Sequence, residues 1–462
     1  MSWKPVLLGG SRLTPFLLRS ERTYCSKNIL KLQERGMYAD IFPGDSANEV
    51  SDLINKQPQT VYSGFDPTAD SLHIGNLLVL MNLFHWQRGG HNVIILLGGA
   101  TATVGDPSGK NSERKKLYKV EVEKNTKEIE SLLKTIIDNH ESLYARRLPN
   151  KLKPITIVNN ADWYENMSAL EFLGDVGRNF RIGTMLGRQS VRDRMNSGDG
   201  MSFTEFSYQI LQAYDWLHLY EHHNCRFQIG GNDQTGNIWA GFDLIQRIHN
   251  KRVFGLTVPL MTNEEGDKYG KSGGNAIWLS RLKTSAFQLY QFFIRTKDSE
   301  VQKLLMLYTF ESVPRVLEIM KEHWKDPEKR LAQRFLAEEV VRLVHGEEGV
   351  LQAERITNAL YNRSIEALQD LDVSDIQSAF EGATTVEMLL KPGTTLLDAA
   401  LDAGCFKSEK DALRISSAGG FYINHQRASN LDEVVTPASH ILPNNLTLMR
   451  VGRKHYYIVK WL

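Results

Sequence analysis

The sequence has few cysteines, almost no net charge and no long apolar run, and each shortage excludes a class of protein. Its three cysteines, Cys25, Cys225 and Cys405, are widely separated and form no CxxC pair, so neither a disulfide framework nor a zinc site is expected. The formal net charge is +1, so any contact with nucleic acid must come from local basic patches. Glycine or charge interrupts every apolar stretch before it could span a bilayer, so we expect no membrane partner.

Acidic residues are also missing from the start of the chain, where none precedes Glu21. Lys4, Arg12 and Arg19 are interspersed there with leucine, serine and threonine. Because mitochondrial transit peptides are basic, amphipathic and poor in acids, we predict one in residues 1–30 and place the protein in the mitochondrial matrix. Arg12 interrupts the apolar run that a secretory signal would need. A disordered N-terminal extension would show the same composition.

Up to residue 285 the sequence alternates between apolar strands and amphipathic helices. A hydrophobic fraction of 42% and a charged fraction of 24% are typical of a globular protein, and 462 residues suffice for two or three domains. Gln59–Gly64 and His91–Leu97 are predicted strands, joined by a helix that begins after His73 and ends at Gly89. The near-continuous apolar second strand is typical of a parallel sheet covered on both faces. We therefore predict a doubly wound α/β fold that binds its ligands at the carboxyl edge of the sheet.

The strand pattern stops beyond residue 285. Helical periodicity follows over residues 286–294, 299–309, 312–324, 327–345 and 348–361, and then an acidic, loosely patterned linker over residues 362–392. The tail, residues 394–462, combines two predicted helices, Leu396–Ala403 and Glu409–Ala418, with two predicted strands, Phe421–Asn424 and Tyr456–Trp461. Its basic side chains suit RNA, although a stabilising α/β cap could carry them too. These residues are Lys407, Lys410, Arg414, Arg453 and Lys454.

Two short motifs offer donors and positive charge to a phosphate. His73-Ile74-Gly75-Asn76 stands at a helix start, where unpaired backbone N–H groups and the helix dipole favour anions. Far downstream, Lys268-Tyr269-Gly270-Lys271-Ser272 places two lysines beside a glycine. An ordinary capped helix and a solvated turn would each explain one motif alone.

Together these motifs resemble the HIGH and KMSKS signatures of class I aminoacyl-tRNA synthetases. Longer words narrow the resemblance: YSGFDPTADSLHIG from Tyr62, GGATATVGDPSGKNSER from Gly98, FTEFSYQILQAYD from Phe203 and QIGGNDQTGN from Gln228. With them the chain resembles the bacterial-type tyrosyl-tRNA synthetase family from about Thr60 to its C-terminus. The resemblance implies a Rossmann-like catalytic domain in residues 31–285, a helical anticodon-binding domain in 286–385 and a small α/β RNA-binding module in 394–462.

The activity that the resemblance implies is activation of tyrosine by ATP, followed by transfer of tyrosine to the 3′ end of tRNA(Tyr) for mitochondrial translation. The tyrosine carboxylate is already ionised at neutral pH, so the first step needs positioning and charge stabilisation rather than a general base. The residues that match the family's catalytic positions are Thr68, His73, Asn76, Lys110, Arg114, Lys268, Lys271 and Ser272.

Residues that match the family's substrate positions fall into two groups. By resemblance, Tyr62 and Asp215 contact the phenol hydroxyl, whereas Asp106, Tyr208 and Gln212 contact the amino group. Tyr208, Gln212 and Asp215 are spaced i, i+4 and i+7, which puts them on one helix face. The other matches for tyrosine are Gly64, Asp66 and Gln228, with Asn159 as a weaker one. The matches for ATP are Asp66, His73, Gly75, Gly230, Asp233, Gln234, Lys268 and Lys271.

ATP is expected with Mg²⁺ held mainly by phosphate oxygens and water, so we predict no metal cage in the protein and no tightly bound cofactor. The expected partners are L-tyrosine, ATP and tRNA(Tyr), and the resemblance implies a homodimer.

The chain departs from the family at Asn76, where many members have a second histidine, and at Ser63, Asn232 and Thr235. Two other functions fit part of the pattern. A tryptophanyl-tRNA synthetase would not need Tyr62 with Asp215 and lacks the tail. A catalytically inactive RNA-binding homologue would be expected to lose Asp106 or the phosphate-contacting lysines.

Overall fold

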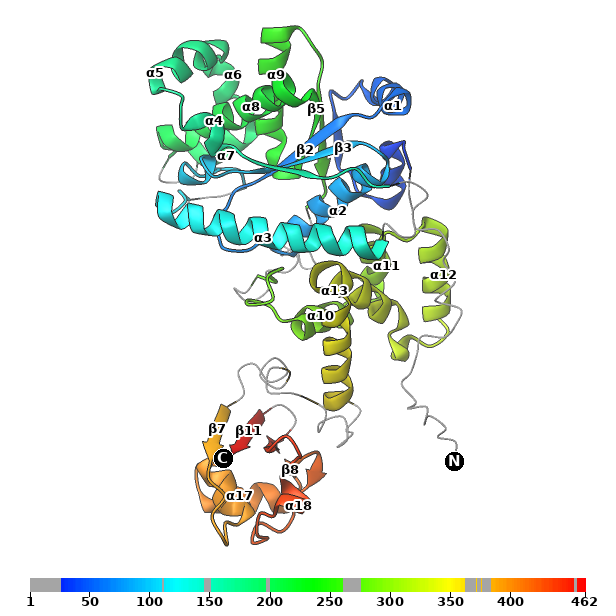
Figure 1. Ribbon diagram of the computed structural model, residues 1–462, viewed down its shortest axis with the longest axis vertical. Helices are drawn as coiled ribbons and strands as arrows, with labels where there is room; N and C mark the ends of the chain where they lie inside the picture. Colours follow the sequence, from blue (N-terminus) through cyan, green and yellow to red (C-terminus); the bar gives the residue numbers. More distant parts are fainter. Residues whose placement is uncertain are drawn as a thin grey trace. The chain divides into compact units, whose positions relative to one another are not determined.

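The computed structural model describes residues 26–109, 112–144, 151–196, 200–260, 276–361, 371, 375, 384–452 and 455–462. The chain divides into two compact units, which Figure 1 draws in sequence colours. The larger unit contains Met1–Thr284 and Phe293–Val344, and the smaller contains Ser285–Phe292 and His345–Leu462. Most of the predicted transit peptide lies outside the described residues, and the predicted domain boundaries stay a prediction.

The larger unit is built on a six-stranded sheet in the order β1-β6-β5-β2-β3-β4. Five strands are parallel, and only β1 runs antiparallel to its neighbour β6. The strands are β1 (Asp40–Phe42), β2 (Thr60–Phe65), β3 (Asn92–Leu97), β4 (Thr156–Asn159), β5 (Cys225–Gly231) and β6 (Phe254–Val258). This sheet confirms the predicted doubly wound α/β class. Strand β1 was not predicted, because its three residues are too few to show a period.

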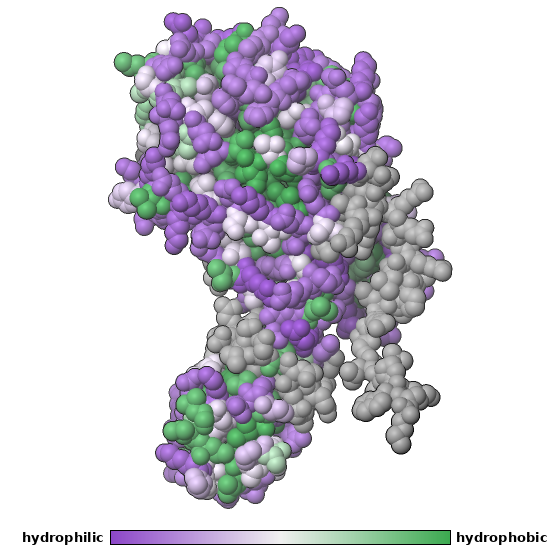
Figure 2. Space-filling view, in the orientation of Figure 1, coloured by the Kyte–Doolittle hydropathy of each residue, from purple (hydrophilic) through white to green (hydrophobic). Residues whose placement is uncertain are grey.

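Strand β2 lies at the switch in strand order, between β3 on one side and β5 on the other. Tyr62 of β2 is in register with Ile94 of β3 and with Gln228 of β5. The carboxyl ends of β2 and β5 therefore open a crevice, which is where ligands of this architecture bind. Figure 2 shows apolar side chains gathered in the middle of the larger unit, inside a rim of polar ones.

Helix α2 (Ile74–Arg88) follows β2, and its residues from Leu77 to Arg88 are all buried. Helices α8 (Phe203–His223) and α9 (Thr235–His249) pack together, and their residues Trp216 and Leu244 share one core with Ile94 of β3. Figure 1 shows the long α3 (Lys119–Tyr144) running beside α2. The shorter helices of this part are η1 (Ile29–Arg35), α1 (Ala47–Lys56), η2 (Thr101–Thr103), α4 (Ala161–Tyr164), α5 (Ala169–Glu171), η4 (Phe172–Val176), η5 (Gly177–Asn179), α6 (Ile182–Leu186), α7 (Gln189–Met195) and η6 (Asn232–Gln234).

The predicted helical stretch consists of helices and their connecting turns over residues 286–361. It contains α10 (Ala286–Ile294), α11 (Asp298–Tyr308), α12 (Val313–His323), η8 (Pro327–Lys329) and α13 (Leu331–Tyr361). The two helices predicted over residues 327–361 form α13, which breaks at Gly346 because this residue has a φ of 74°.

The smaller unit holds a five-stranded sheet in the order β7-β11-β10-β8-β9. Its strands are β7 (Thr384–Met388), β8 (Phe421–Ile423), β9 (Gln426–Arg427), β10 (Leu446–Val451) and β11 (His455–Trp461), and its helices are α16 (Leu396–Asp402), α17 (Glu409–Ser417) and α18 (Pro437–His440). The predicted helices and strands of the tail are confirmed. Strand β7 contradicts the predicted linker, because it pairs in parallel with β11 at the far end of the chain.

Candidate active site

A cavity of about 520 Å³ opens at the carboxyl ends of β2 and β5. It brings together almost all of the predicted substrate and nucleotide residues that the structure describes. Those that line it are Tyr62, Gly64, Asp66, Thr68, His73, Gly75, Asn76, Asp106, Arg114, Tyr208, Gln212, Asp215, Gln228, Asp233 and Gln234. Gly230 lies behind the wall, where a Cβ would come within 2.9 Å of the Gln234 Cβ. Lys110, Lys268, Lys271 and Ser272 lie outside the described residues.

One end of the cavity holds a buried carboxylate that is fixed by two donors. Asn160 Nδ2 donates to Asp215 Oδ2 at 3.1 Å, and Trp163 Nε1 donates to Asp215 Oδ1 at 2.9 Å. Burial raises the pKa of Asp215 to about 7, although these hydrogen bonds favour its charged form. Burial and the nearby Asp215 charge also raise the pKa of Tyr62. The Tyr62 hydroxyl is buried and has no hydrogen-bond partner among the described residues, so this end suits a ligand hydroxyl.

Asn160 and Trp163 were not predicted from the sequence. The neighbouring Asn159 was, but its Oδ1 accepts hydrogen bonds from the backbone N–H groups of Gly99 and Ala161, at 3.2 and 3.0 Å. Asn159 therefore holds the glycine turn after β3, whereas Asn160 faces the cavity. The pair Asn159-Asn160 directly follows the short apolar stretch of residues 155–158, and this pattern could have indicated Asn160 as well as Asn159.

The other end of the cavity collects negative charge. Asp66 accepts hydrogen bonds from Thr101 Oγ1 and from the Tyr208 hydroxyl, both at 2.7 Å. Burial raises the pKa of Asp66 to about 6, the two hydrogen bonds lower it, and the neighbouring Asp106 raises it again. Gln212 lines the same end. Two carboxylates, a phenol and an amide oxygen form a site for a ligand cation such as an ammonium group.

Asn237, in the first turn of α9, contacts several polar side chains at this end of the cavity. It was not predicted from the sequence. Its amide Nδ2 lies 3.0 Å from Gln212 Oε1, 3.2 Å from Gln234 Oε1 and 3.3 Å from Asp106 Oδ1. An amide nitrogen has only two protons, so these acceptors outnumber its donors and keep the site electronegative. Gln234 Nε2 in turn donates to Asp106 Oδ2 at 2.7 Å.

The predicted phosphate motif at the start of α2 is at the same time the cap of that helix. His73 Nδ1 accepts from the Asn76 N–H at 3.3 Å, and Asn76 Oδ1 accepts from the His73 N–H at 3.0 Å. The Asn76 side-chain oxygen is therefore committed to the cap. The backbone N–H of Ile74 is likewise committed, because it donates to Ile277 O at 2.9 Å.

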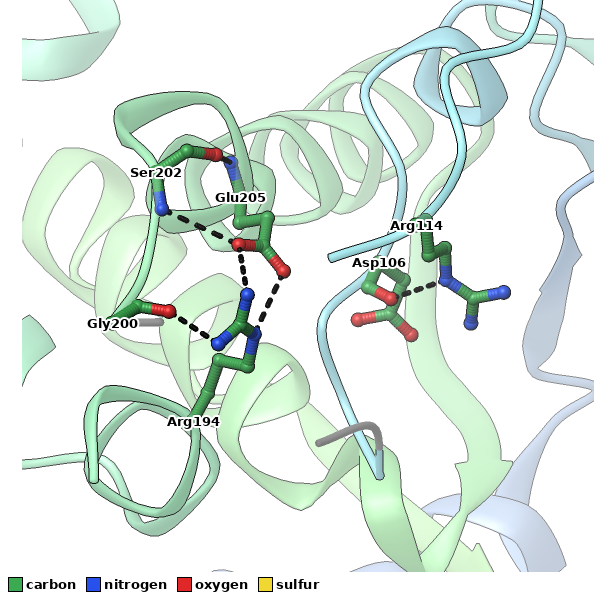
Figure 3. Close-up of polar contacts among 6 residues, drawn as sticks. All are labelled: Asp106, Arg114, Arg194, Gly200, Ser202 and Glu205. Atoms are coloured by element: carbon green, nitrogen blue, oxygen red, sulfur yellow. Dashed lines mark hydrogen bonds and ion pairs between the residues drawn. The ribbon is translucent and has the colours of Figure 1, made fainter. Parts of the chain in front are cut away.

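That last bond is one of several long-range pairings between the start of α2 and the described residues 277–279. Leu279 N also donates to Leu72 O at 2.8 Å, and Trp278 lies in a β-bridge with His73. Long-range pairing thus holds residues 277–279 beside His73. Arg114 lines the cavity close by, and its Nε donates to the Asp106 carbonyl oxygen at 2.6 Å (Figure 3).

Helix α8, which carries Tyr208, Gln212 and Asp215, is fixed at its N-terminus by a buried ion pair (Figure 3). Arg194 of α7 contacts both carboxylate oxygens of Glu205, at 3.0 and 3.1 Å, and each side chain is only 2% exposed. Ser202 caps the same helix and shares a capping box with Glu205.

Two further features concern the described part of the chain. It contains no group of three or more His, Cys, Asp or Glu side chains that could hold a metal ion. None of its helices is long and apolar enough to cross a membrane.

A family model described as tRNA synthetases class I (W and Y) matches residues 55–362, and a tyrosine–tRNA ligase SYY-like C-terminal domain matches residues 375–459. The Rossmann-like sheet with its cavity at the switch point, together with these matches, defines a class I aminoacyl-tRNA synthetase. The mitochondrial tyrosine–tRNA ligase of Drosophila melanogaster is 54% identical over 97% of this chain and 97% of its own length. The chain belongs to the tyrosine–tRNA ligase family.

Other relatives agree with this placement. The mitochondrial tyrosine–tRNA ligase of Homo sapiens is 44% identical over 98% of this chain and 95% of its own length. The crystal structure of a C-terminally truncated mitochondrial tyrosyl-tRNA synthetase from Aspergillus nidulans matches with a TM-score of 0.66 at 35% identity. The match covers 72% of this chain and 94% of the Aspergillus nidulans chain.

Proposed function

We propose that the chain joins tyrosine to its tRNA in two steps. The tyrosine carboxylate attacks the α-phosphate of ATP, so that an oxygen–phosphorus bond forms and pyrophosphate leaves. A ribose hydroxyl at the 3′ end of tRNA(Tyr) then attacks the tyrosyl carbonyl, and AMP leaves. Because the attacking carboxylate is ionised at neutral pH, the rate of the first step depends on positioning and on stabilising charge at the phosphoryl group.

The observation that carries this proposal is that one buried cavity has two chemically different ends. The Asp215 carboxylate and the unpartnered Tyr62 hydroxyl match the phenol of tyrosine. Asp66, Asp106 and Tyr208 match its ammonium group. Phenylalanine would leave the Asp215 carboxylate buried without a ligand partner, which opposes its binding.

Residues at the start of α2 and along the glycine turn face the nucleotide in this proposal. Thr68, His73, Gly75 and Arg114 line the cavity where the helix N-terminus favours phosphate. Lys110, Lys268, Lys271 and Ser272 join them by resemblance, and Asp233 and Gln234 take the ribose side. Mg²⁺ accompanies ATP and is held mainly by phosphate oxygens and water.

ATP–pyrophosphate exchange, measured with each amino acid in turn, tests the proposal. We expect exchange with tyrosine and no comparable exchange with phenylalanine or tryptophan. Exchange that depends on tryptophan would instead assign the chain to the tryptophan branch. No exchange with any amino acid, in protein that still binds tRNA, would favour the catalytically inactive RNA-binding homologue.

We propose that the smaller unit holds the tRNA through a basic surface. Lys410 and Arg414 lie one turn apart on α17 and are exposed, whereas Lys407 precedes the helix and its Ser408 cap. The Arg450 guanidinium lies 4.0 Å from the Tyr422 ring centroid, beside which a base could stack. Arg453 and Lys454 lie outside the described residues.

Replacing Lys407, Lys410 and Arg414 together by alanine should weaken tRNA charging and leave pyrophosphate exchange unchanged. The slope of log affinity against log salt is negative, and each lost phosphate contact should reduce its magnitude by about 1. Filter binding at several salt concentrations, beside both enzyme assays, measures this. Lys391→Ala, another exposed lysine of the same unit, is the control. Equal losses in charging and exchange would mean that these residues support the fold instead.

We propose a homodimer, because three large apolar side chains of the larger unit are mostly exposed in the described part of the chain. The exposed fractions are 83% for Leu170, 68% for Ile182 and 76% for Phe203. These residues belong to α5, α6 and the start of α8, and Figure 1 draws α5 and α6 toward the same edge of the unit. Apolar patches of this kind mark interfaces. Sedimentation of the parent and of Phe203→Glu tests this, since a variant that stays dimeric would remove the surface from the interface.

We propose that residues 1–30 direct the protein to the mitochondrial matrix. The composition of this segment and the mitochondrial relatives support the proposal. A reporter fused to residues 1–35 should enter mitochondria and become resistant to added protease. The same fusion with Lys4, Arg12 and Arg19 changed to glutamate should stay outside. If both fusions are imported equally, the basic residues do not direct the protein to mitochondria.

A further inference from the structure

Thr101 lies between the two ends of the cavity and connects them. Its hydroxyl is buried in η2, donates to Asp66 Oδ1 at 2.7 Å and accepts from Asn160 Nδ2 at 2.9 Å. Asn160 Nδ2 also donates to Asp215 Oδ2 at 3.1 Å. A continuous chain of hydrogen bonds therefore runs from the carboxylate at the phenol end to the carboxylate at the ammonium end.

When both carboxylates are ionised, only one arrangement of protons is possible along this series of hydrogen bonds. The Thr101 hydroxyl has a single proton, and it must go to Asp66, since an ionised carboxylate can only accept. A lone pair of Thr101 then faces Asn160, which uses its two amide protons for Thr101 and Asp215. Asn160 Oδ1 accepts from the Ala100 N–H at 2.8 Å, so the amide cannot turn over without losing that bond as well.

The backbone at Gly98 closes one side of the Thr101 hydroxyl. A Cβ built on Gly98 would collide with Asp66 Oδ1 and would lie 2.5 Å from Thr101 Oγ1. Thr101 itself is only 2% exposed. The glycine thus lets the backbone approach this pair closely, and no volume remains on that side for a water molecule to replace the hydroxyl.

We propose that the Thr101 hydroxyl is a positioning group that couples the phenol and ammonium ends of the tyrosine pocket, so that each end binds its part of the substrate better when the other is filled. This inference rests on the proposed tyrosine specificity. A substrate ammonium beside Asp66 keeps that carboxylate ionised. The ionised carboxylate keeps the Thr101 proton pointed at itself, and this keeps the Asn160 amide aimed at Asp215.

The surroundings of Asp66 make its charge responsive to a cation. Burial raises the pKa of Asp66 to about 6, and the neighbouring Asp106 carboxylate raises it further, whereas Thr101, Tyr208 and Arg114 lower it. A ligand ammonium acts in the same direction as Arg114, and it stabilises the ionised form. A ligand without an amine leaves Asp66 closer to protonation, and a protonated Asp66 no longer fixes the direction of the Thr101 hydroxyl.

Four ligands measure this coupling without relying on the chemical step. L-tyrosine has both groups, L-phenylalanine lacks the hydroxyl, 3-(4-hydroxyphenyl)propionate lacks the amine and 3-phenylpropionate lacks both. The gain in affinity from the hydroxyl is determined once with the amine and once without it, by calorimetry or by competition on the full chain. The ratio of the two gains is the coupling factor, which we expect to be about fivefold or more in the parent protein.

Three variants separate coupling from general support of the fold. Thr101→Val replaces the hydroxyl by a methyl group of similar volume and should bring the coupling factor down to about one. Thr101→Ser keeps the hydroxyl and should retain it. Thr103 lies two residues after Thr101 in η2, and its hydroxyl donates to Ala100 O. Thr103→Val removes this hydroxyl and should leave the coupling factor at the parent value.

The outcomes that oppose the proposal are distinct. If Thr101→Val weakens the binding of all four ligands equally and the coupling factor keeps its parent value, Thr101 only supports the fold. A factor of one in the parent overturns the proposal even if the valine variant does not fold. A parent protein that binds phenylalanine as well as tyrosine would overturn the tyrosine assignment itself, whereas a selective parent with uncoupled ends would overturn only the role of Thr101.

Discussion

Replacing Asp215 by alanine should collapse the preference for tyrosine over phenylalanine. Tyrosine would lose a hydrogen bond to a charged acceptor, worth roughly 1.5–3 kcal/mol, which corresponds to about a tenfold to hundredfold loss in efficiency. Phenylalanine has no hydroxyl, and in the variant it would no longer leave a carboxylate buried without a ligand partner. The ratio of kcat/KM values therefore falls from both sides. Adenylate formation with each amino acid gives this ratio.

A change of pH offers an independent check on the same group. Because the pKa of Asp215 is raised to about 7, lowering the pH from 8 to 6 protonates it and removes the charged acceptor. The tyrosine to phenylalanine ratio of the parent should fall over this interval, and that of Asp215→Asn should stay flat. Burial also raises the pKa of Asp66, to about 6, but both amino acids carry the ammonium group that keeps this carboxylate ionised, so it does not titrate in either complex over this interval. An unchanged ratio in folded Asp215→Ala would falsify the assignment of Asp215 to the phenol.

The parts of the site that the sequence predicted correctly are local. For the strand, loop and helix from Gln59 to Gly89, the apolar periodicity, the turn residues and the helix cap all lie within one short stretch of sequence. The same holds for α8, where the i, i+4, i+7 spacing of Tyr208, Gln212 and Asp215 is sufficient to put all three on one face, and all three line the cavity. Helical periodicity and parallel-strand patterns carry this much because they depend on neighbours along the chain.

The residues that sequence reasoning missed depend on contacts between distant segments. Asn160 acquires its role only because β4 pairs with β3, which carries it to the carboxyl edge near Asp215. Asn237 acquires its role because α9 packs on α8. Strand β7 pairs with the last strand of the chain, so nothing in its own sequence distinguishes it from a linker. Periodicity gives the face of an element, but not the element that it will meet.

The second large effect concerns stability, and it is expected for Arg194→Met. The methionine has a similar volume but leaves the Glu205 carboxylate buried without its counter-ion. Removing one partner of a buried pair costs about 3–5 kcal/mol, because the remaining charge stays away from water. Denaturant unfolding followed by circular dichroism should show this loss, and the tyrosine KM should rise because Glu205 fixes the start of α8.

Two further variants identify the cause of that loss. In the double variant Arg194→Met with Glu205→Gln, the unpaired charge is gone and glutamine can still serve the capping box, so most of the stability should return. Lys134→Met removes one side of an ion pair of 2.6 Å whose side chains are 61% and 39% exposed, so its effect should stay below about 1 kcal/mol. If Arg194→Met costs no more than Lys134→Met, the buried pair does not hold α8 in place. If the double variant is as unstable as the single one, the arginine stabilises the helix through its contact with the Gly200 carbonyl oxygen rather than by neutralising Glu205.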